Sequence, residues 1–221
     1  LNNMTHEFKT PLATISLAVD SIKHPKTKEQ PGQVDHFANI IMQENRRMND
    51  QVERVLQVAR LDRQETELQL QKVDLNELVQ ETVQQMKLNL DQANAQVIIG
   101  LHDGTLEIDA DNLHLKNAIR NLLDNAVKYS EAAPLISIRT ETKNKMSVLR
   151  IADQGIGMSV EQQEHVFEQF YRATTGNLHN TKGFGLGLYY VKHIVNLHGG
   201  EVILNSIPSK GTQIEIQLPL K

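Results

Sequence analysis

The sequence predicts an α-helical hairpin that forms a dimeric four-helix bundle, followed by an α/β two-layer sandwich, a mixed sheet with helices on one face. Apolar residues recur every three or four positions up to about residue 64, whereas strand-like and helix-like segments alternate after residue 72. Nine of the twelve glycines and six of the nine aromatic residues lie after residue 150. We therefore expect a helical domain over 1–64, a linker over 65–72 and a second domain over 73–221.

Composition excludes several classes of function. The chain has 221 residues and a net charge of −4, so a basic surface for nucleic acid is not expected. It contains no cysteine, which excludes disulfides, thiolate metal sites and cysteine nucleophiles and fits a cytoplasmic location. No apolar run reaches the ~18–20 residues of a transmembrane helix. Residue 1 lies inside a helical pattern, so we expect the chain to be part of a longer protein.

Two amphipathic helices account for the first domain. The first spans 1–23 and the second spans about 33–64, where Val34, Ile41, Met48 and Val55 recur every seven residues. Between them, residues 24–32 contain two prolines and a glycine and are predicted to form a loop. Because each helix buries only one face against its partner, we expect the hairpin to pair with a second copy.

The second domain is predicted to mix helices and strands in one sheet. Helices are expected over 73–93 and 111–130, from near 160, and through 197, with Asp111 as an N-cap. The expected strands cover 95–101, 105–111, 135–142, 146–153, 201–206 and 211–219. The third and fourth strands are predicted to form a hairpin around 143–145, and the last two an antiparallel pair.

The first helix presents an unusual polar face. If Phe8 marks the centre of the apolar stripe, a step of ~100° per residue turns His6 and Thr10 toward solvent, with Glu7 beside them. A carboxylate next to an exposed imidazole can orient one ring nitrogen as a nucleophile. Pro11 cannot donate a backbone hydrogen bond, so it either loosens the helix beside His6 or marks the helix start.

The helix predicted over 111–130 has polar groups opposite its apolar face. Asn121, Asn125 and Lys128 are spaced by four and three residues, and asparagine is a poor helix former. Amide oxygens at this spacing can ligate a hard cation, and a lysine one turn further can meet a phosphate. A solvated polar face would show the same pattern, so these residues alone leave both interpretations open.

The strand over 146–153 leads into a second candidate site. Alternation places Asp153 on the same side as the apolar residues before it, where a buried carboxylate requires a donor such as an adenine amino group. Gly155 and Gly157 would allow the backbone to approach a flat ring closely. A D-x-G-x-G segment also occurs in ordinary turns, so its meaning depends on the other motifs.

A glycine-rich run follows the aromatic residues Phe167 and Phe170. Gly183, Gly185 and Gly187 precede a predicted helix, so backbone N–H groups and the helix dipole can hold phosphate oxygens. By itself a G-x-G-x-G run is weak evidence. The chain contains no G-x-x-x-x-G-K-[ST] segment, which excludes a P-loop.

Taken in order, the segments HEFKTPL, NLLDNAVKYS, DQGIGM, FEQFYR, GFGLGL and GTQIEI resemble the conserved boxes of bacterial sensor histidine kinases. The resemblance covers almost the whole chain and has no departure at a catalytic position. It implies a dimerisation and histidine-phosphotransfer hairpin followed by an ATP-binding domain. It also implies ATP and Mg²⁺ as cofactors, a response-regulator receiver domain as partner, and a membrane anchor in the full-length protein.

The resemblance also implies a role for each matched residue. In the hairpin, His6 is the phospho-acceptor, Glu7 a general base, and Thr10 positions the water that dephosphorylates the regulator. In the nucleotide site, the resemblance implies that Asn125 binds Mg²⁺ with Asn121 close to the metal, and that Lys128 and Tyr129 contact the nucleotide. It implies that Asp153 binds adenine with the help of Thr212, and that the backbone approaches the ring at Gly155 and Gly157. The lid is expected to have its hinge and phosphate-binding end at Gly183, Gly185 and Gly187, with Phe167 and Phe170 seating it.

Two other functions remain open at this point. One is an ATPase of the related topoisomerase and mismatch-repair type, in which ATP closes a dimer. The exposed H-E-x-x-T segment on a hairpin argues against it. The other is a catalytically degenerate kinase that serves as a dimeric scaffold, against which the intact Asn125, Asp153 and glycines argue.

Overall fold

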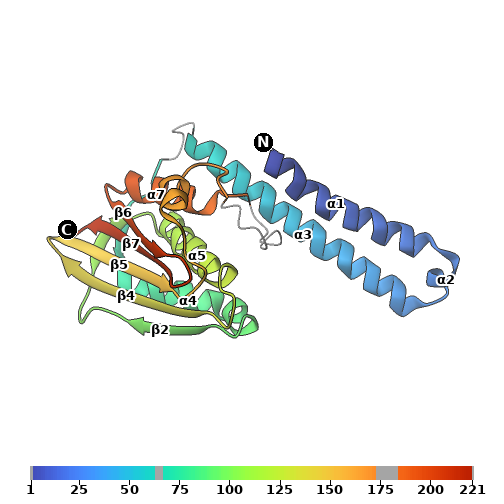
Figure 1. Ribbon diagram of the computed structural model, residues 1–221, viewed down its shortest axis with the longest axis horizontal. Helices are drawn as coiled ribbons and strands as arrows, with labels where there is room; N and C mark the ends of the chain where they lie inside the picture. The colour runs from blue at the N-terminus through green and yellow to red at the C-terminus, as the bar shows by residue number, and fades with distance from the viewer. Residues whose placement is uncertain (1, 63–66, 173–183, 221) are drawn as a thin grey trace. The chain divides into compact units, whose positions relative to one another are not determined.

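The computed structural model describes residues 2–62, 67–172 and 184–220, and it divides the chain into two compact units (Figure 1). The first unit comprises residues 1–65 with 182–186, and the second comprises 66–181 with 187–221. None of the helices within the described ranges is both long and apolar enough to cross a membrane.

The first unit is the predicted helical hairpin. Helix α1 (Asn2–Lys23) packs against α3 (Pro31–Asp62), and the helix continues through Pro11 instead of starting there. The predicted loop over 24–32 was only partly right, because it contains a one-turn helix, α2 (Pro25–Lys28). Both α2 and α3 begin with proline, whose fixed φ angle suits the first helical position.

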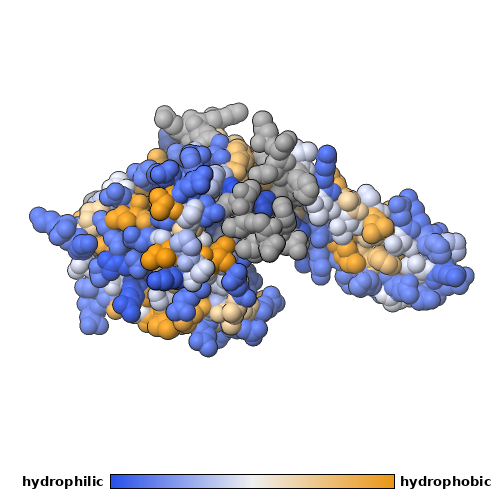
Figure 2. Space-filling model, viewed as in Figure 1, coloured by the Kyte–Doolittle hydropathy of each residue, from blue (hydrophilic) through white to orange (hydrophobic). Residues whose placement is uncertain are grey.

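The hairpin has an apolar seam inside and further apolar side chains outside. Ala18 on α1 and Val58 on α3 are each 3% exposed. Apolar side chains at least two-fifths exposed on the same helices are Leu12, Leu17, Met42, Val52 and Leu56. Figure 2 shows apolar atoms at the surface of the hairpin among polar ones. Each helix therefore carries more apolar surface than one hairpin buries.

The second unit contains a five-stranded mixed sheet in the order β2-β4-β5-β7-β6. Strand β2 runs parallel to β4, and the other neighbours are antiparallel. The strands of this sheet are β2 (Gln96–Gly100), β4 (Leu135–Lys143), β5 (Met146–Asp153), β6 (Glu201–Ile207) and β7 (Gly211–Pro219). Asn144 and Lys145 both have positive φ, as a tight hairpin turn between β4 and β5 requires.

Helices cover one face of this sheet. The layer contains α4 (Leu75–Gln92), α5 (Asn112–Lys128) and α7 (Gly187–Leu197), while α6 (Val160–His165) is a single short helix. Alternate strand residues such as Ile138, Leu149 and Ile216 are fully buried. The packing of α5 and α7 on β5, β6 and β7 confirms the predicted sandwich with helices on one face.

One strand pair lies outside the predicted single sheet. Strands β1 (Gln71–Asp74) and β3 (Glu107–Ala110) form a separate antiparallel ribbon. Strand β1 takes the last two residues of the expected linker and the first two of the expected helix, so α4 begins at Leu75. Four residues provide too little periodicity to predict a strand, and it is the distant partner β3 that supplies the backbone hydrogen bonds.

Candidate functional site

Helix α5 holds the predicted polar triplet in place. Asp111 caps the helix by accepting a hydrogen bond from the backbone N of His114 at 3.0 Å. Leu115, Ile119 and Leu122 bury the apolar face. On the other side, the half-buried Asn121, Asn125 and Lys128 extend over two turns. The Nδ2 atom of Asn121 donates to the carbonyl of Asn117 at 2.9 Å, which fixes the orientation of its amide.

The first residue of α7 lies directly against this polar face. A Cβ atom added to Gly187 would lie 3.2 Å from Oδ1 of Asn121 and 3.8 Å from Nδ2 of Asn125. The structure thus brings together the asparagine and glycine motifs, although more than sixty residues separate them. Free backbone N–H groups at a helix start next to amide side chains are suited to hold phosphate oxygens.

Of the other two glycines in the run, only Gly185 belongs to the described part of the structure. Gly185 has a φ of 71°, in the left-handed region that favours glycine. Gly183, a predicted lid residue, lies outside the described residues. The glycine run is therefore described at its helical end only.

Asp153 ends β5 with its carboxylate held by the backbone. Its Oδ1 atom accepts hydrogen bonds from the N–H of Gly155 at 2.8 Å and of Thr212 at 3.1 Å. Burial raises the pKa of Asp153, and these two hydrogen bonds only partly oppose the rise. Within the described part of the chain, Oδ2 has no hydrogen-bond partner. This second oxygen is available to a ligand donor such as an amino group.

The loop after Asp153 packs tightly on its neighbours, which explains its glycines. The backbone N of Ile156 donates to the carbonyl of Tyr129 at 3.0 Å, which joins the loop to the end of α5. A side chain at Gly155 would press on that same carbonyl. Gly157 has a φ of 62°, and a Cβ there would overlap the carbonyl of Ile207. The asparagine helix and the aspartate loop therefore form one continuous region.

Thr212 contacts Asp153 through its backbone amide, not through its side chain. Its amide donates to Asp153, while its hydroxyl shares a 2.8 Å hydrogen bond with the hydroxyl of Ser206. The sequence interpretation expected Thr212 to assist in adenine binding and overlooked Ser206. The Ser206 hydroxyl also donates to the carbonyl of Gly211 at 3.0 Å, so it braces the turn that presents the Thr212 amide. In the sequence, the one sign of this bracing role is a serine placed across a short hairpin from Gly211 and Thr212.

Cationic and aromatic side chains pair at two further positions. Nζ of Lys128 donates to the hydroxyl of Tyr129 at 3.0 Å and lies 4.6 Å from its ring centre. Nζ of Lys192 on α7 lies 5.2 Å from the ring centre of Phe167. Phe170 is half-buried and has a φ of 64°, which is uncommon for an aromatic residue. The structure thus links Phe167 to the glycine helix α7.

The predicted acceptor motif lies on α1. His6 and Glu7 belong to this helix, but their side chains are outside the described part of the structure. Thr10 is exposed, as the helical periodicity predicts, and its carbonyl accepts a hydrogen bond from the Thr14 hydroxyl at 3.1 Å. Pro11 is buried in the hairpin.

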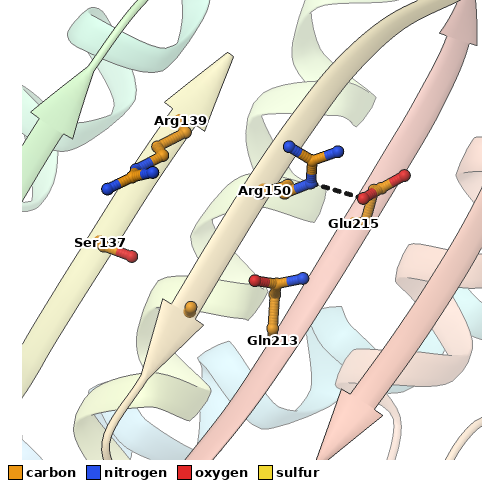
Figure 3. A pocket seen from close by; sticks show the side chains of 6 residues that line it. Ser137, Arg139, Arg150, Gln213 and Glu215 are labelled. Carbon is orange, nitrogen blue, oxygen red and sulfur yellow. Dashed lines mark hydrogen bonds and ion pairs between the residues drawn. The ribbon is translucent and has the colours of Figure 1, made fainter. Parts of the chain in front are cut away.

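A shallow hollow of about 580 Å³ lies elsewhere, on the sheet face that the helices leave uncovered (Figure 3). Arg150 bridges Glu215 at 2.6 Å and Glu141 at 2.7 Å there. These bonds raise the pKa of the Arg150 guanidinium, and its hydrogen bond lowers the pKa of Glu141. The residues that line the hollow are Ser137, Arg139, Arg150, Ala152, Gln213 and Glu215. Because they lie on the opposite face from α5 and α7, this hollow is separate from the site around Asn125 and Asp153.

The donor set around α5 fits a magnesium nucleotide better than a metal held by protein alone. No group of three or more His, Cys, Asp or Glu side chains capable of holding a metal ion occurs among the described residues. Asn121 and Asn125 supply amide oxygens, and Gly187, which has no Cβ, allows the start of α7 to approach them closely. Mg²⁺ commonly takes one or two protein ligands and completes its shell with phosphates and water.

The fold and the site together define a class of protein, an α/β sandwich of the ATPase type preceded by a helical hairpin. Residues 110–221 match the family described as "Histidine kinase-, DNA gyrase B-, and HSP90-like ATPase". Residues 1–64 match the "His Kinase A (phospho-acceptor) domain". The chain belongs to this ATPase family and is a bacterial sensor histidine kinase catalytic core.

Individual relatives agree with this assignment. The chain is 41% identical to "Sensor protein RprX" of Bacteroides fragilis over 222 residues, covering 100% of this chain and 43% of the relative. It is 30% identical to "Sensor-like histidine kinase SenX3" of Mycobacterium tuberculosis over 217 residues, covering 98% and 52%. The chain thus spans about half the length of these curated relatives.

Solved structures support the fold. The "Acinetobacter baumannii histidine kinase AdeS" aligns with a TM-score of 0.73 at 20% identity, covering 98% of both chains. The "Mycobacterial sensor histidine kinase MprB" aligns with a TM-score of 0.59 at 27% identity, covering 69% of this chain and 98% of that one.

Proposed function

We propose that the chain binds Mg-ATP, transfers its γ-phosphoryl group to His6, and then passes that group to an aspartate of a response-regulator receiver domain. The observation that carries this proposal is the convergence of Asn121, Asn125 and Gly187, with Asp153 joined to the same region, in a chain whose first 64 residues match a phospho-acceptor domain. A nucleotide site and an acceptor histidine on one chain are the two parts that autophosphorylation requires.

The chain's own groups account for nucleotide binding. Oδ2 of Asp153 would accept the adenine amino group, and the tight loop at Gly155 and Gly157 would lie against the ring. Lys128 and Tyr129 would contact the nucleotide, while the N–H groups at the start of α7 would hold phosphate oxygens. Gly183 and Gly185 would form the lid hinge, and Phe167 and Phe170 would seat the lid.

The metal site would involve Asn125, with Asn121 close by. When bound, Mg²⁺ would neutralise charge on the phosphate oxygens, as in other phosphoryl transfers. The two amides would orient the triphosphate in the same place, and the absence of a side chain at Gly187 brings the first N–H groups of α7 close to them.

The transfer itself would take place on α1. A ring nitrogen of His6 attacks the γ-phosphorus in line, the bond to the bridging oxygen breaks, and ADP leaves. Glu7 would act as the general base that accepts the ring proton, and the product is a phosphoramidate. Thr10 is exposed one turn further along α1. It would position the water that removes the phosphoryl group from the regulator.

The partners of the whole protein follow from the same proposal. The exposed apolar side chains of α1 and α3 would pair with a second copy to form the four-helix bundle. One solved relative, at 21% identity, is titled "histidine kinase ThkA (TM1359) in complex with response regulator protein TrrA (TM1360)", which supports a receiver domain as partner. Because the curated relatives are about twice as long and are named sensors, we propose that this chain is the cytoplasmic part of a membrane-anchored sensor.

The proposal predicts a phosphorylated histidine on the hairpin. With γ-labelled Mg-ATP, the wild-type chain should acquire label that is lost in acid and retained in base, because phosphoramidates are acid-labile. His6→Gln should abolish the label and leave ATP binding unchanged. His36→Gln is the matched control, since His36 is an exposed histidine on α3 of the same hairpin.

Other outcomes would identify a different function. Persistent label in His6→Gln would assign the acceptor to another residue. ATP turnover by the wild type without any phosphoprotein would indicate an ATPase of the clamp type. A failure to bind Mg-ATP at all would indicate a scaffold.

A further inference from the structure

A hydrogen-bonded junction lies at the ends of α5 and α7 that are remote from the candidate site. The backbone N of Asp111, the N-cap of α5, donates to Nε2 of His198 at 2.9 Å. Nδ1 of His198 is bonded to the carbonyl of Ile194 at 2.7 Å, so the proton is on Nδ1 and Nε2 is the acceptor. A second tie joins Nδ1 of His114 to the hydroxyl of Tyr190 at 2.9 Å. We call this set, with Gln69, the Asp111 junction.

The same aspartate also holds the linker. Its Oδ1 atom caps α5, and its Oδ2 atom accepts a hydrogen bond from the backbone N of Gln69 at 2.9 Å. In residues 67–70 this is the one hydrogen bond made to the rest of the described chain, and Leu70 is 55% exposed. Among the described residues, the hydrogen bond from Gln69 to Asp111 is thus the one that joins the linker just before β1 to the helix layer.

Asp111 and Tyr190 form the buried centre of the junction, His114 and His198 are half-buried, and Gln69 is exposed. Asp111 is 7% exposed and Tyr190 is 2% exposed. Burial raises the pKa of Asp111, but the N–H groups of His114 and Gln69 outweigh it and hold the pKa below its usual value. Burial lowers the pKa of His198, which favours the neutral ring that this hydrogen bond requires. Two helices in apolar contact can shift along each other at little cost. A buried hydrogen-bond network whose groups are all paired in only one geometry instead fixes a single relative position of the helices.

The junction and the site lie at opposite ends of the same two helices. Asp111 and His198 join the start of α5 to the end of α7, whereas Asn121 meets Gly187 at the start of α7. Ten residues of helix separate Asp111 from Asn121, a distance of about 15 Å. Neither Asp111 nor His198 can therefore touch a nucleotide at Asn125, but both hold the register of the helices that form its site.

We propose that Asp111 and His198 are positioning residues of the nucleotide site, and that Asp111 makes nucleotide affinity depend on the attachment of the linker. This inference rests on the proposed function, because it assumes that the ligand at Asn125 is Mg-ATP. By reciprocity, nucleotide binding would strengthen the attachment of the linker by the same factor.

Two variants separate the connections that Asp111 makes to the linker and to α7. Asp111→Ser keeps a capping oxygen for α5 but loses the second acceptor, so it releases Gln69 alone. His198→Leu removes the acceptor for the Asp111 amide, whereas His198→Gln retains a carboxamide oxygen that can accept it. Asp74→Ser is the matched control, because Asp74 caps α4 and accepts from Asn76 and Leu106 at 2.9 and 3.2 Å.

The measurements are the affinity of the full chain for Mg²⁺ with an imido analogue of ATP, the free energy of unfolding, and amide exchange. We expect Asp111→Ser and His198→Leu to weaken the affinity by about fivefold or more, the lower end of typical coupling between sites. His198→Gln should restore most of it. Asp74→Ser should lower stability to a similar extent without this loss of affinity.

Two results would overturn the inference. One is unchanged affinity in Asp111→Ser when the Gln69 amide exchanges freely. The other is a loss of affinity in Asp74→Ser that is as large, relative to its loss of stability, as the loss in the junction variants. If the wild type itself bound no Mg-nucleotide, the proposed function would fail instead. Exchange at the start of α7 in His198→Leu, measured without nucleotide, would still decide whether the junction holds the two helices.

Discussion

At the scale of single residues, Asp153 shows most directly how the fold prepares a ligand site at some cost in stability. Its carboxylate is half-buried, and two backbone N–H groups bond the same oxygen, Oδ1. Burial raises its pKa, which means that the charged form is disfavoured before any ligand arrives. A ligand amino group on Oδ2 would supply the donor that this oxygen lacks in the described chain.

We therefore predict that Asp153→Asn raises thermal stability without nucleotide and weakens ATP binding by at least about tenfold, since a lost charge-assisted hydrogen bond costs about 1.5–3 kcal/mol. An Asn oxygen can still accept from Gly155 and Thr212, but its NH₂ group would face the adenine amino group. Calorimetric melting and nucleotide titration measure the two effects. A variant that binds ATP as well as the wild type would contradict this role.

The same residue gives a pH dependence with a definite sign. A raised folded-state pKa means that the associated stability is fully present below the unfolded value of about 3.9 and is lost as pH rises through the folded pKa. The melting temperature of Asp153→Asn minus that of the wild type should thus be small near pH 4 and increase toward pH 7. A difference that is constant with pH would show that ionisation of Asp153 is not its source.

At the scale of elements, the candidate site depends on how α5 and α7 meet. Helix α5 supplies Asn121 and Asn125, and α7 supplies its N-terminal N–H groups and Gly187. Helix periodicity in the sequence predicts the polar face of α5. The 3.2 Å approach of Gly187 to Asn121 follows from the packing of α7 beside α5 on the sheet, so no local pattern could have predicted it.

Gly187→Ala should weaken Mg-ATP binding several-fold while changing stability by less than about 1 kcal/mol. The new methyl group would press on Oδ1 of Asn121 and displace it by a few tenths of an ångström. The loss in packing is offset because alanine favours a helix over glycine by about 1 kcal/mol. Nucleotide titration with denaturant unfolding measures both. Gly32→Ala, where an added Cβ meets nothing within 4 Å, is the control.

At the scale of the whole molecule, the apolar surface of the hairpin exceeds what its own two helices bury. Leu17 and Met42 are 69% and 51% exposed, and Leu12, Val52 and Leu56 on the same two helices are also at least two-fifths exposed. A second copy covering these side chains would complete the four-helix bundle that the sequence predicts.

Met42→Glu and Leu17→Glu should shift the chain from dimer to monomer. Each removes one large apolar side chain per subunit, worth about 1.5–3 kcal/mol when buried, so the dimer should weaken by at least about tenfold. Sedimentation velocity across concentrations measures the effect. Leu88→Glu is the control, since Leu88 is 69% exposed on α4 of the other unit. A wild-type chain that is monomeric at all concentrations would reject this surface as the dimer interface.

The sequence by itself determined the amphipathic hairpin, the order of the helices and strands other than α2 and β1, and the motif residues, because each rests on local periodicity or on residue type. It also determined the family, since six motifs occur in order along the chain. Only the tertiary structure decided what depends on pairing between distant segments. Strand β1 forms because β3 supplies its partner, and Asp153 is held by the amide of Thr212, 59 residues later. His198 meets Asp111 across 87 residues. Hydrogen-bond partners of this kind are set by how the chain packs, and single-segment patterns carry no information about them.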